Sequence, residues 1–214
     1  MAILQGRDGR NADDSRDTNR LEAFSDGVIA IAITLLVIEI RVPGLEATED
    51  GERLWSKLWD LWPSYLGYLI SFIVIGIMWA NHYNIFKHIA RVDHYLILIN
   101  TLLLLFIGFV PFTTGLLAEY LKHDGEKTAT IVYTGWFLAT ALVYNLLWRY
   151  ASRWGNLLDP EADPAEIATI NRRFNVGPPS YALAFAAAFV YPPAALAIFI
   201  ALALLYALPS SAPV

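Results

Sequence analysis

The sequence has no cysteine and little charge. Without cysteine, disulfide bonds, thiolate metal sites and cysteine nucleophiles are excluded. Only 16% of the residues are charged, whereas a water-soluble domain is typically about a quarter charged. The sequence also lacks the HExxH, GxSxG and Walker motifs of common enzymes and the TVGYG filter of ordinary potassium channels. We therefore expect no enzymatic activity, no cofactor and no small-molecule substrate.

Apolar residues make up 57% of the chain and lie in continuous blocks of about twenty. Because a helix rises about 1.5 Å per residue, a block of this length crosses roughly 30 Å of hydrocarbon. Val and Ile show no alternation between faces, so no strand is predicted. The predicted spans cover about 21–40, 62–86, 94–117 and 128–148, then two shorter stretches within 174–208, split by Pro192 and Pro193. The sequence thus predicts an all-α membrane protein with six transmembrane helices.

The polar segments divide the chain into three parts. Residues 1–19 contain several Arg and Asp residues and no apolar run, so we expect a disordered tail. Residues 20–208 are expected to form one six-helix transmembrane domain, and residues 209–214 a short C-terminal tail.

Two connections and one proline carry further expectations. The polar stretch 41–60 is expected to be an ordered loop. The stretch 149–173 is the longest internal loop, with Asp159 or Asp163 placed to cap a short helix at the membrane surface. Pro111 interrupts the third span and is expected to kink it.

The distribution of Lys and Arg predicts the orientation. Ten of these residues fall on the side of the N-terminal tail and five on the opposite side. Because positive residues are retained on the cytoplasmic side, both termini are expected to be cytoplasmic in a multi-pass protein of the cell inner membrane. The net charge of −5 argues against nucleic acid as a partner.

The first span has an apolar face. At about 100° per residue, Gly27, Ile31, Leu35 and Ile38 share one side of the helix, with Thr34 at its edge. Such a stripe most simply packs against other helices or lipid. Periodicity alone does not identify a pore.

A polar pair lies on another side of the same span. Ser25 and Asp26 point away from the apolar face, and Trp79 and His82 share one face of the second span. Because alternate spans are antiparallel, Asn100 of the third span is expected at the same end of the bundle. A cluster of these five side chains would satisfy polar groups that are costly inside a membrane.

Asp26 has two interpretations. It is either a structural anchor, paired with Arg20 or with the polar groups of the next spans, or a proton or ion site. His82, His88 and His94 could suggest metal or haem ligation, but two of them flank the short loop KHIARVDH, where interfacial histidine is unexceptional, and no metal ligation is predicted.

Several segments together resemble the transmembrane protein 175 family, the endolysosomal-type potassium channels and their prokaryotic relatives. The signature comprises Arg20, Phe24, Ser25, Asp26, Gly27 and Val28, followed by AIAITLL. Trp79 and His82, then LINTLLLLFIGFVPF with Asn100 and Pro111, resemble the second and third spans of that family. The segment SYALAFAAAFVYPPAALAIFIALALLYALPS resembles its fifth and sixth spans.

The resemblance implies a homotetramer with a potassium-preferring pore lined by the first helix of each subunit. When the family's pattern is aligned on the FSD tripeptide, which is residues 24–26 here, its narrow aliphatic rings fall on Ile31, Leu35 and Ile38. Its selectivity-linked threonine falls on Thr34. Potassium is then the permeant ion, and the partners are membrane lipid and three further copies. The family's FSD residues bond with the tryptophan, histidine and asparagine that correspond to Trp79, His82 and Asn100.

Two other functions remain open from the sequence. One is a proton-coupled cation carrier that uses Asp26 and His82 as titrating groups. The other is a non-conducting accessory subunit of a larger membrane assembly.

Overall fold

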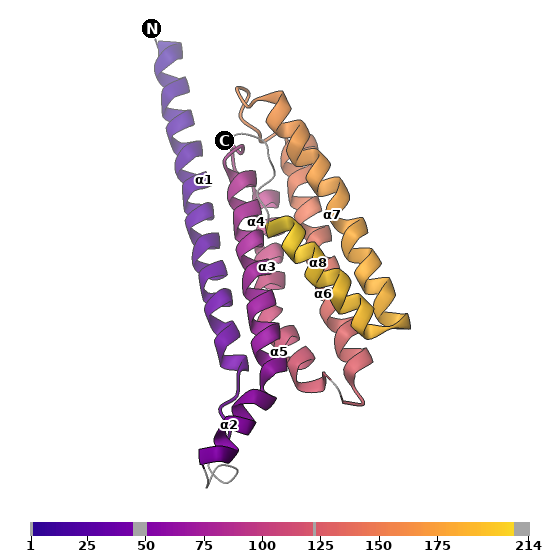
Figure 1. The fold of residues 1–214 in the computed structure, drawn as a ribbon. Coiled ribbons are helices and arrows are strands. Elements are labelled where there is room, and N and C mark those ends of the chain that lie inside the picture. The colour runs from indigo at the N-terminus through magenta and orange to yellow at the C-terminus, as the bar shows by residue number, and fades with distance from the viewer. Residues whose placement is uncertain (1, 45–50, 122, 208–214) are drawn as a thin grey trace.

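The computed structural model describes residues 2–44, 51–121 and 123–207, and its regular elements are helices (Figure 1). The N-terminal helix α1 (Ala2–Leu35) continues into a 3-10 turn (Leu36–Glu39). The helices that follow are α2 (Gly51–Asp60), α3 (Trp62–Phe86), α4 (His94–Gly108), α5 (Val110–Tyr120), α6 (Glu126–Arg149) with a π-helical extension (Tyr150–Trp154), α7 (Pro164–Val190) and α8 (Pro192–Ala207).

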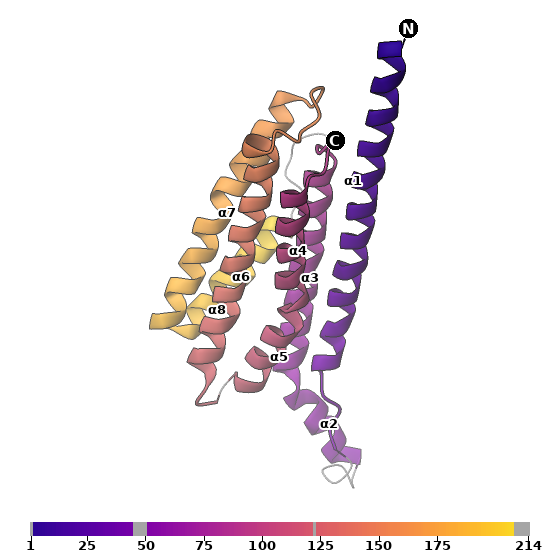
Figure 2. The same cartoon turned by 180° about the vertical axis from the view of Figure 1, so that it is seen from behind.

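The long helices lie side by side in an elongated bundle, with α1 along one edge and the hairpin of α7 and α8 at the other (Figures 1 and 2). Helix α2 projects from the end of the bundle where α3 begins (Figure 1). Within the described ranges, four helical segments are long and apolar enough to cross a membrane: Arg16–Glu39, Trp62–Phe86, His94–Tyr120 and Glu126–Trp154. The predicted all-α, multi-pass membrane class is confirmed.

Helix α1 begins earlier than the sequence suggested. A disordered tail was expected over residues 1–19, whereas the structure describes a helix from Ala2 onward. No proline occurs before Leu35, so nothing removes a donor from the hydrogen-bond ladder. Once the apolar part of α1 has formed, each further residue adds to an existing helix and escapes the cost of nucleation. Residue 1 and the C-terminal tail at 209–214 lie outside the described residues.

The connection expected as a loop over 41–60 contains helix α2. Leu54, Trp55, Leu58 and Trp59 recur at helical spacing, which gives this short segment an amphipathic pattern. This periodicity explains why a polar-looking connection folds as a helix. Trp55 and Trp59 are strongly exposed in the single chain.

Proline positions determine where two helices begin. Helix α4 ends at Gly108, and Pro111 lies in the first turn of α5, so the third span is broken just before the proline. A proline is tolerated there because the first-turn N–H groups have no intrahelical partner. Pro192 likewise begins α8. The last two apolar stretches are therefore separate helices, divided at the position predicted from the sequence.

Helix α7 joins, in one continuous helix, the short surface helix expected before residue 174 and the first of the two apolar stretches expected within 174–208. Asp163 accepts a hydrogen bond from the backbone N–H of Ala165 and caps the helix, whereas Asp159 caps a turn by accepting from the N–H of Glu161. The helix then runs 27 residues to Val190, through Pro178 and Pro179. Helix α7 packs extensively against α6, and a neighbouring helix of this kind supports a helix that continues through prolines.

Aromatic side chains join α8 to the rest of the bundle. Phe199 of α8 lies 5.1 Å from Tyr133 and 4.8 Å from Phe137 of α6, measured between ring centroids. All three side chains are fully buried. Helix α6 also receives Phe185 of α7 against Gly135, where a larger residue would clash. Packing at α6 therefore holds the terminal hairpin in place.

We predict that Phe199→Ala destabilises the folded chain by roughly 2 kcal/mol. Lipid is about as apolar as the core, so the loss comes from the packing contacts around the cavity and not from transfer into water. Thermal unfolding in detergent should show a clearly lower Tm. Phe189→Ala is the control, because Phe189 is an exposed phenylalanine on α7. Equal shifts for the two variants would contradict the role assigned to the α6–α8 contact.

Candidate functional site

One side of α1 is packed against the bundle. Ser25, Ile29, Ala32 and Leu36 recur every three or four residues and are almost completely buried. Helices α3 and α4 contact α1 most extensively, whereas the 3-10 turn that carries Leu36 contacts α5 and α3. The small side chains of Ser25 and Ala32 allow the neighbouring helices to approach closely.

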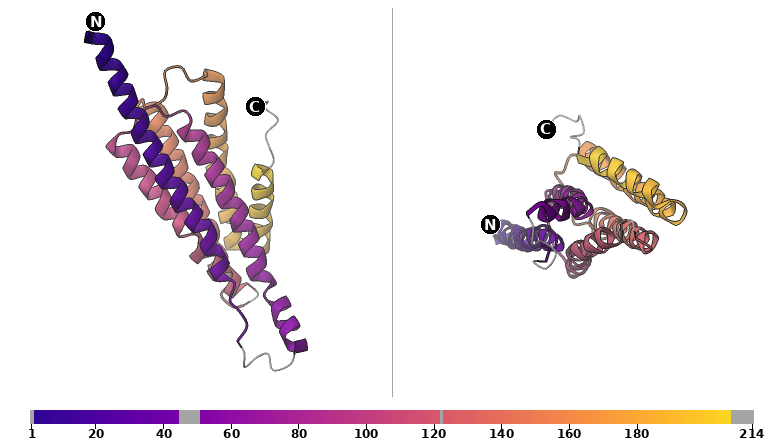
Figure 3. Two further views of the ribbon diagram at one scale, coloured as in Figure 1. Left: turned by 90° about the vertical axis from the view of Figure 1, so that its left-hand side faces the viewer. Right: turned by 60° about the horizontal axis from the view of Figure 1, so that its bottom comes forward.

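The other side of α1 is open. Ile31 and Ile38 expose 60% and 68% of their surface, and Leu35 is also exposed. Thr34 lies on this side, with its hydroxyl donating to the carbonyl of Ile31 at 2.8 Å. The view along the bundle shows α1 at its edge, packed from one side only (Figure 3). The face predicted from helical spacing is thus uncovered in a single chain.

The exposed surface of α1 extends beyond the predicted residues. Phe24 is 59% exposed and lies on the same side of the helix as Ile31 by helical spacing, although it was not among the predicted residues; Val37 is 54% exposed and lies off that side by helical spacing. Val37 is displaced because the helix tightens to a 3-10 turn at Leu36–Glu39, which changes the angle between successive side chains. Helical periodicity alone does not predict this change of geometry.

A chain of buried hydrogen bonds fixes the packed side of α1. The Ser25 hydroxyl donates to the carbonyl of Leu21 at 2.8 Å and accepts from Nδ2 of Asn100, also at 2.8 Å. Oδ1 of Asn100 lies 3.0 Å from Nε2 of His82, which donates to it in this arrangement of the amide. All three polar side chains are fully buried, so α1, α3 and α4 are joined through Asn100.

Asp26 makes the second polar contact between α1 and α3. Its carboxylate accepts a hydrogen bond of 2.9 Å from the indole N–H of Trp79. His82, one turn further along α3, stacks on Phe86 with ring centroids 4.2 Å apart. In the part of the chain that the structure describes, Nδ1 of His82 is buried without a hydrogen-bond partner.

The structure brings together five of the six residues of the predicted polar network. Ser25 and Asp26 of α1 contact side chains of α3 and α4 as described above. Arg20 is exposed, and among the described residues no hydrogen bond or ion pair joins it to Asp26. The carboxylate therefore has the Trp79 indole, and not Arg20, as its partner.

A second buried polar group was missed by the sequence reasoning. The hydroxyl of Ser71 in α3 lies 2.8 Å from that of Thr114 in α5 and 3.1 Å from that of Tyr133 in α6. Gly67, one turn earlier in α3, packs against Thr114. A lone serine within an apolar span was the available signal, but its partners lie 43 and 62 residues away.

The described residues contain no group of three or more His, Cys, Asp or Glu side chains that could hold a metal ion. His82 is buried between helices, whereas His88 lies in the turn after α3 and His94 begins α4. The contacts of the site are therefore those of helix packing and hydrogen bonding.

These features define a class: a multi-pass helical membrane protein in which one helix is anchored by buried polar contacts on one side and open on the other. A family model described as endosomal/lysosomal potassium channel TMEM175 matches residues 20–111. The chain belongs to the TMEM175 family, a family of ion channels and not of enzymes.

Comparisons with two sequence relatives and one solved structure place the chain within this family. A potassium channel of Chamaesiphon minutus is 47% identical over 94% of this chain and 98% of its own length. The crystal structure of a lysosomal potassium-selective channel TMEM175 homolog from that organism matches with a TM-score of 0.83 and 45% identity, covering 92% of this chain and all of the other. The bovine endosomal/lysosomal proton channel TMEM175 is 30% identical over 84% of this chain but only 36% of its own length.

We predict that Asn100→Leu loosens the attachment of α1. The substitution removes the amide of Asn100, and with it the hydrogen bonds to Ser25 and His82, at nearly constant side-chain volume. His82 is then left without a hydrogen bond in an apolar interior. Each unpaired buried group costs about 1–3 kcal/mol, with values inside membranes at the low end of this range. The Tm in detergent should fall by several degrees.

Thr101→Val provides the matched control for this measurement. Thr101 is exposed, and its hydroxyl bonds only to the carbonyl of Ile97 on its own helix. If Asn100→Leu is as stable as Thr101→Val, the Ser25–Asn100–His82 chain does not anchor α1.

Proposed function

We propose that four copies of this chain form a potassium-selective channel of the cell inner membrane, with α1 of each copy lining a central pore. The observation that carries the proposal is the asymmetry of α1. Polar contacts fix one side of the helix, while the other side presents exposed Ile31, Leu35 and Ile38. The names of the C. minutus relatives support potassium as the permeant ion.

The three aliphatic side chains would form successive narrow rings around the pore axis. Such rings oppose the passage of ions, because an apolar constriction wets poorly and offers no replacement for the hydration shell of the ion. Permeation would then depend on widening or wetting of the rings. No chemical reaction is involved.

Thr34 would contribute to selectivity between the rings of Ile31 and Leu35. Its hydroxyl hydrogen bonds to the Ile31 carbonyl, so its oxygen keeps lone pairs that can coordinate a partly dehydrated cation. Four such oxygens favour an ion that loses water at moderate cost. Potassium fits this requirement better than the more strongly hydrated sodium ion.

The polar anchor would keep the rings aligned. Asp26 and Ser25 attach α1 to Trp79 and Asn100, at the end of the span nearest the N-terminus. A pore helix held in this way keeps its rotational setting, so its aliphatic side chains point inward in every subunit. Helices α7 and α8 would complete six spans, with both termini cytoplasmic.

A proton-coupled cation carrier is the second candidate. The observation that favours it is the buried His82, which has an unpartnered ring nitrogen in the described part of the chain and lies one turn from the Trp79–Asp26 contact. The bovine relative is named as a proton channel. A carrier would require a pH gradient to drive cation flux, whereas the proposed channel would conduct potassium without one.

We predict that Ile31→Asn raises resting potassium flux in liposomes. Amide groups at this position would wet the ring, and each 1.4 kcal/mol or so removed from the barrier raises the rate about tenfold. Leu105→Asn is the control, because Leu105 on α4 is 59% exposed, nearly the same as Ile31. Flux is measured at equal reconstituted protein, with and without an imposed pH gradient.

The outcomes distinguish the candidate functions. Equal flux through both variants, although both assemble, would contradict a pore lined by α1. Flux that requires the pH gradient in the unmodified protein would favour the carrier. If neither the unmodified protein nor the variants conduct, a non-conducting accessory role is favoured.

We also predict that residues 56 and 161 lie on opposite sides of the membrane. Ser56 is exposed on α2 and Glu161 is exposed in the connection before α7, and the chain has no native cysteine to give background. In intact cells, an impermeant thiol reagent should label Ser56→Cys but label Glu161→Cys only after the membrane is opened. Labelling of both in intact cells would contradict the six-span arrangement.

A further inference from the structure

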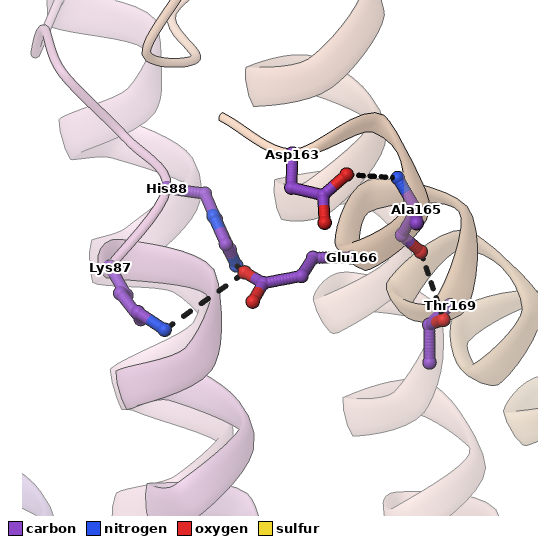
Figure 4. Close-up of polar contacts among 6 residues, drawn as sticks. All are labelled: Lys87, His88, Asp163, Ala165, Glu166 and Thr169. Atoms are coloured by element: carbon purple, nitrogen blue, oxygen red, sulfur yellow. Dashed lines mark hydrogen bonds and ion pairs between the residues drawn. The ribbon is translucent and has the colours of Figure 1, made fainter. Parts of the chain in front are cut away.

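A pocket of about 390 Å³ lies between the end of α3 and the first turns of α7 (Figure 4). It is separate from α1 and from the polar anchor. Its polar lining includes Asn84, Lys87, His88, Asp163, Glu166 and Arg173. Ile170 and Phe174 of α7 add an apolar wall.

Charged groups of both signs face one another in this pocket. Glu166 extends from α7 toward α3, with Oε2 3.9 Å from Nζ of Lys87 and 3.4 Å from Nε2 of His88 (Figure 4). The side chains of Lys87 and Glu166 are about half exposed, so each can accept a further polar partner. Arg173 adds a second full positive charge, and Asp163 a second carboxylate.

The balance of charge restricts the kind of ligand. Lys87 and Arg173 offset Asp163 and Glu166, so the pocket carries no net charge when His88 is neutral. An anion would meet two carboxylates, and a cation would meet two basic groups. A ligand that carries both signs satisfies both sets of groups without leaving an uncompensated charge.

The position of the pocket adds a second restriction. Its lining residues Lys87 and His88 directly follow Phe86, where one membrane-spanning segment ends, and its α7 side runs from Asp163 to Phe174, before the apolar part of α7. This is the level of lipid headgroups. The wall formed by Ile170 and Phe174 gives an apolar surface for the start of an acyl chain.

We propose that this pocket binds the headgroup of a zwitterionic phospholipid with a primary ammonium group and no further charge, that is, a phosphoethanolamine lipid. The phosphate lies toward Lys87 and Arg173, and the ammonium donates to the carboxylates of Glu166 and Asp163. A choline headgroup has no N–H to donate, and a glycerol headgroup has no positive charge. The site is independent of the proposed pore.

A bound lipid at this position would reinforce an existing junction. The backbone N–H of Asp159 donates to the carbonyl of His88 at 2.9 Å, and Arg91 donates to the carbonyl of Asn156, also at 2.9 Å. These bonds join the turn after α3 to the segment before α7. Beside this junction, the headgroup would join the side chains of Lys87 and His88 to those of α7 and its cap, Asp163.

Native mass spectrometry of the full-length, delipidated protein tests the proposal. Dihexanoyl phosphatidylethanolamine, phosphatidylcholine and phosphatidylglycerol are titrated separately, and bound lipid is counted per chain. We expect the ethanolamine lipid to bind roughly tenfold more tightly than the other two, as expected for one additional charge-assisted hydrogen bond. Equal binding of the three lipids would overturn the proposal.

Two variants identify the pocket as the binding site. Glu166→Gln should remove the preference for the ethanolamine lipid and strengthen binding of phosphatidylglycerol, because a carboxylate that repels anions is lost. Glu161→Gln is its control, since Glu161 is exposed and does not line the pocket. If the two variants keep the same lipid preference, the site is not this pocket.

A second pair of variants tests the phosphate end. Arg173→Gln should weaken binding of the ethanolamine lipid roughly tenfold, whereas Arg172→Gln, at the adjacent exposed residue outside the lining, should not. Water-soluble phosphoethanolamine is added as a competitor. Competition by it at the same concentration as the lipid would show that the ligand is the free headgroup compound and would overturn the assignment to a lipid.

Discussion

The amide of Asn100 joins three helices inside a chain that is otherwise apolar. It donates to Ser25 of α1 and accepts from His82 of α3, while its own helix, α4, forms the third side. Apolar packing alone specifies little about helix rotation in a membrane, because lipid is as apolar as the neighbouring helix. Hydrogen bonds between helices are directional, so they form only when the helices have particular rotations about their axes. The bonds of Asn100 are therefore consistent with one rotational setting of α1, and the Trp79–Asp26 contact supports the same setting.

This setting explains why α1 has two different sides. Ser25, Ile29, Ala32 and Leu36 are buried against the bundle, whereas Ile31, Leu35 and Ile38 remain uncovered in a single chain. A pore helix needs such a division, since the side that lines the pore cannot also hold the helix in place. Attachment through α3 and α4 leaves the other side available for contact with further copies.

The membrane class and most of the helices were predictable from the sequence because long apolar blocks have one stable form in lipid, the helix. The hydrogen-bond partner of Asp26 was less predictable from the sequence. Arg20 and Trp79 were both candidates by composition, and the choice of Trp79 depends on how α3 is rotated against α1. The triad of Ser71, Thr114 and Tyr133 was missed for a related reason, because isolated hydroxyls in separate spans give no indication of which of them meet. The continuation of α7 through Pro178 and Pro179 also depends on its neighbour α6.

The sequence by itself determined the all-α membrane class, the spacing of the apolar face on α1 and the residue types of its polar anchor. These follow from local rules: the length of an apolar helix, its angular period and the cost of a polar group in lipid. The tertiary structure alone decided which polar groups pair, that Asn156 and Asp159 meet the turn after α3, and that Lys87 and Glu166 face one another across a pocket. These depend on contacts between residues far apart in the chain, and a one-dimensional pattern does not encode the relative rotation and depth of two helices.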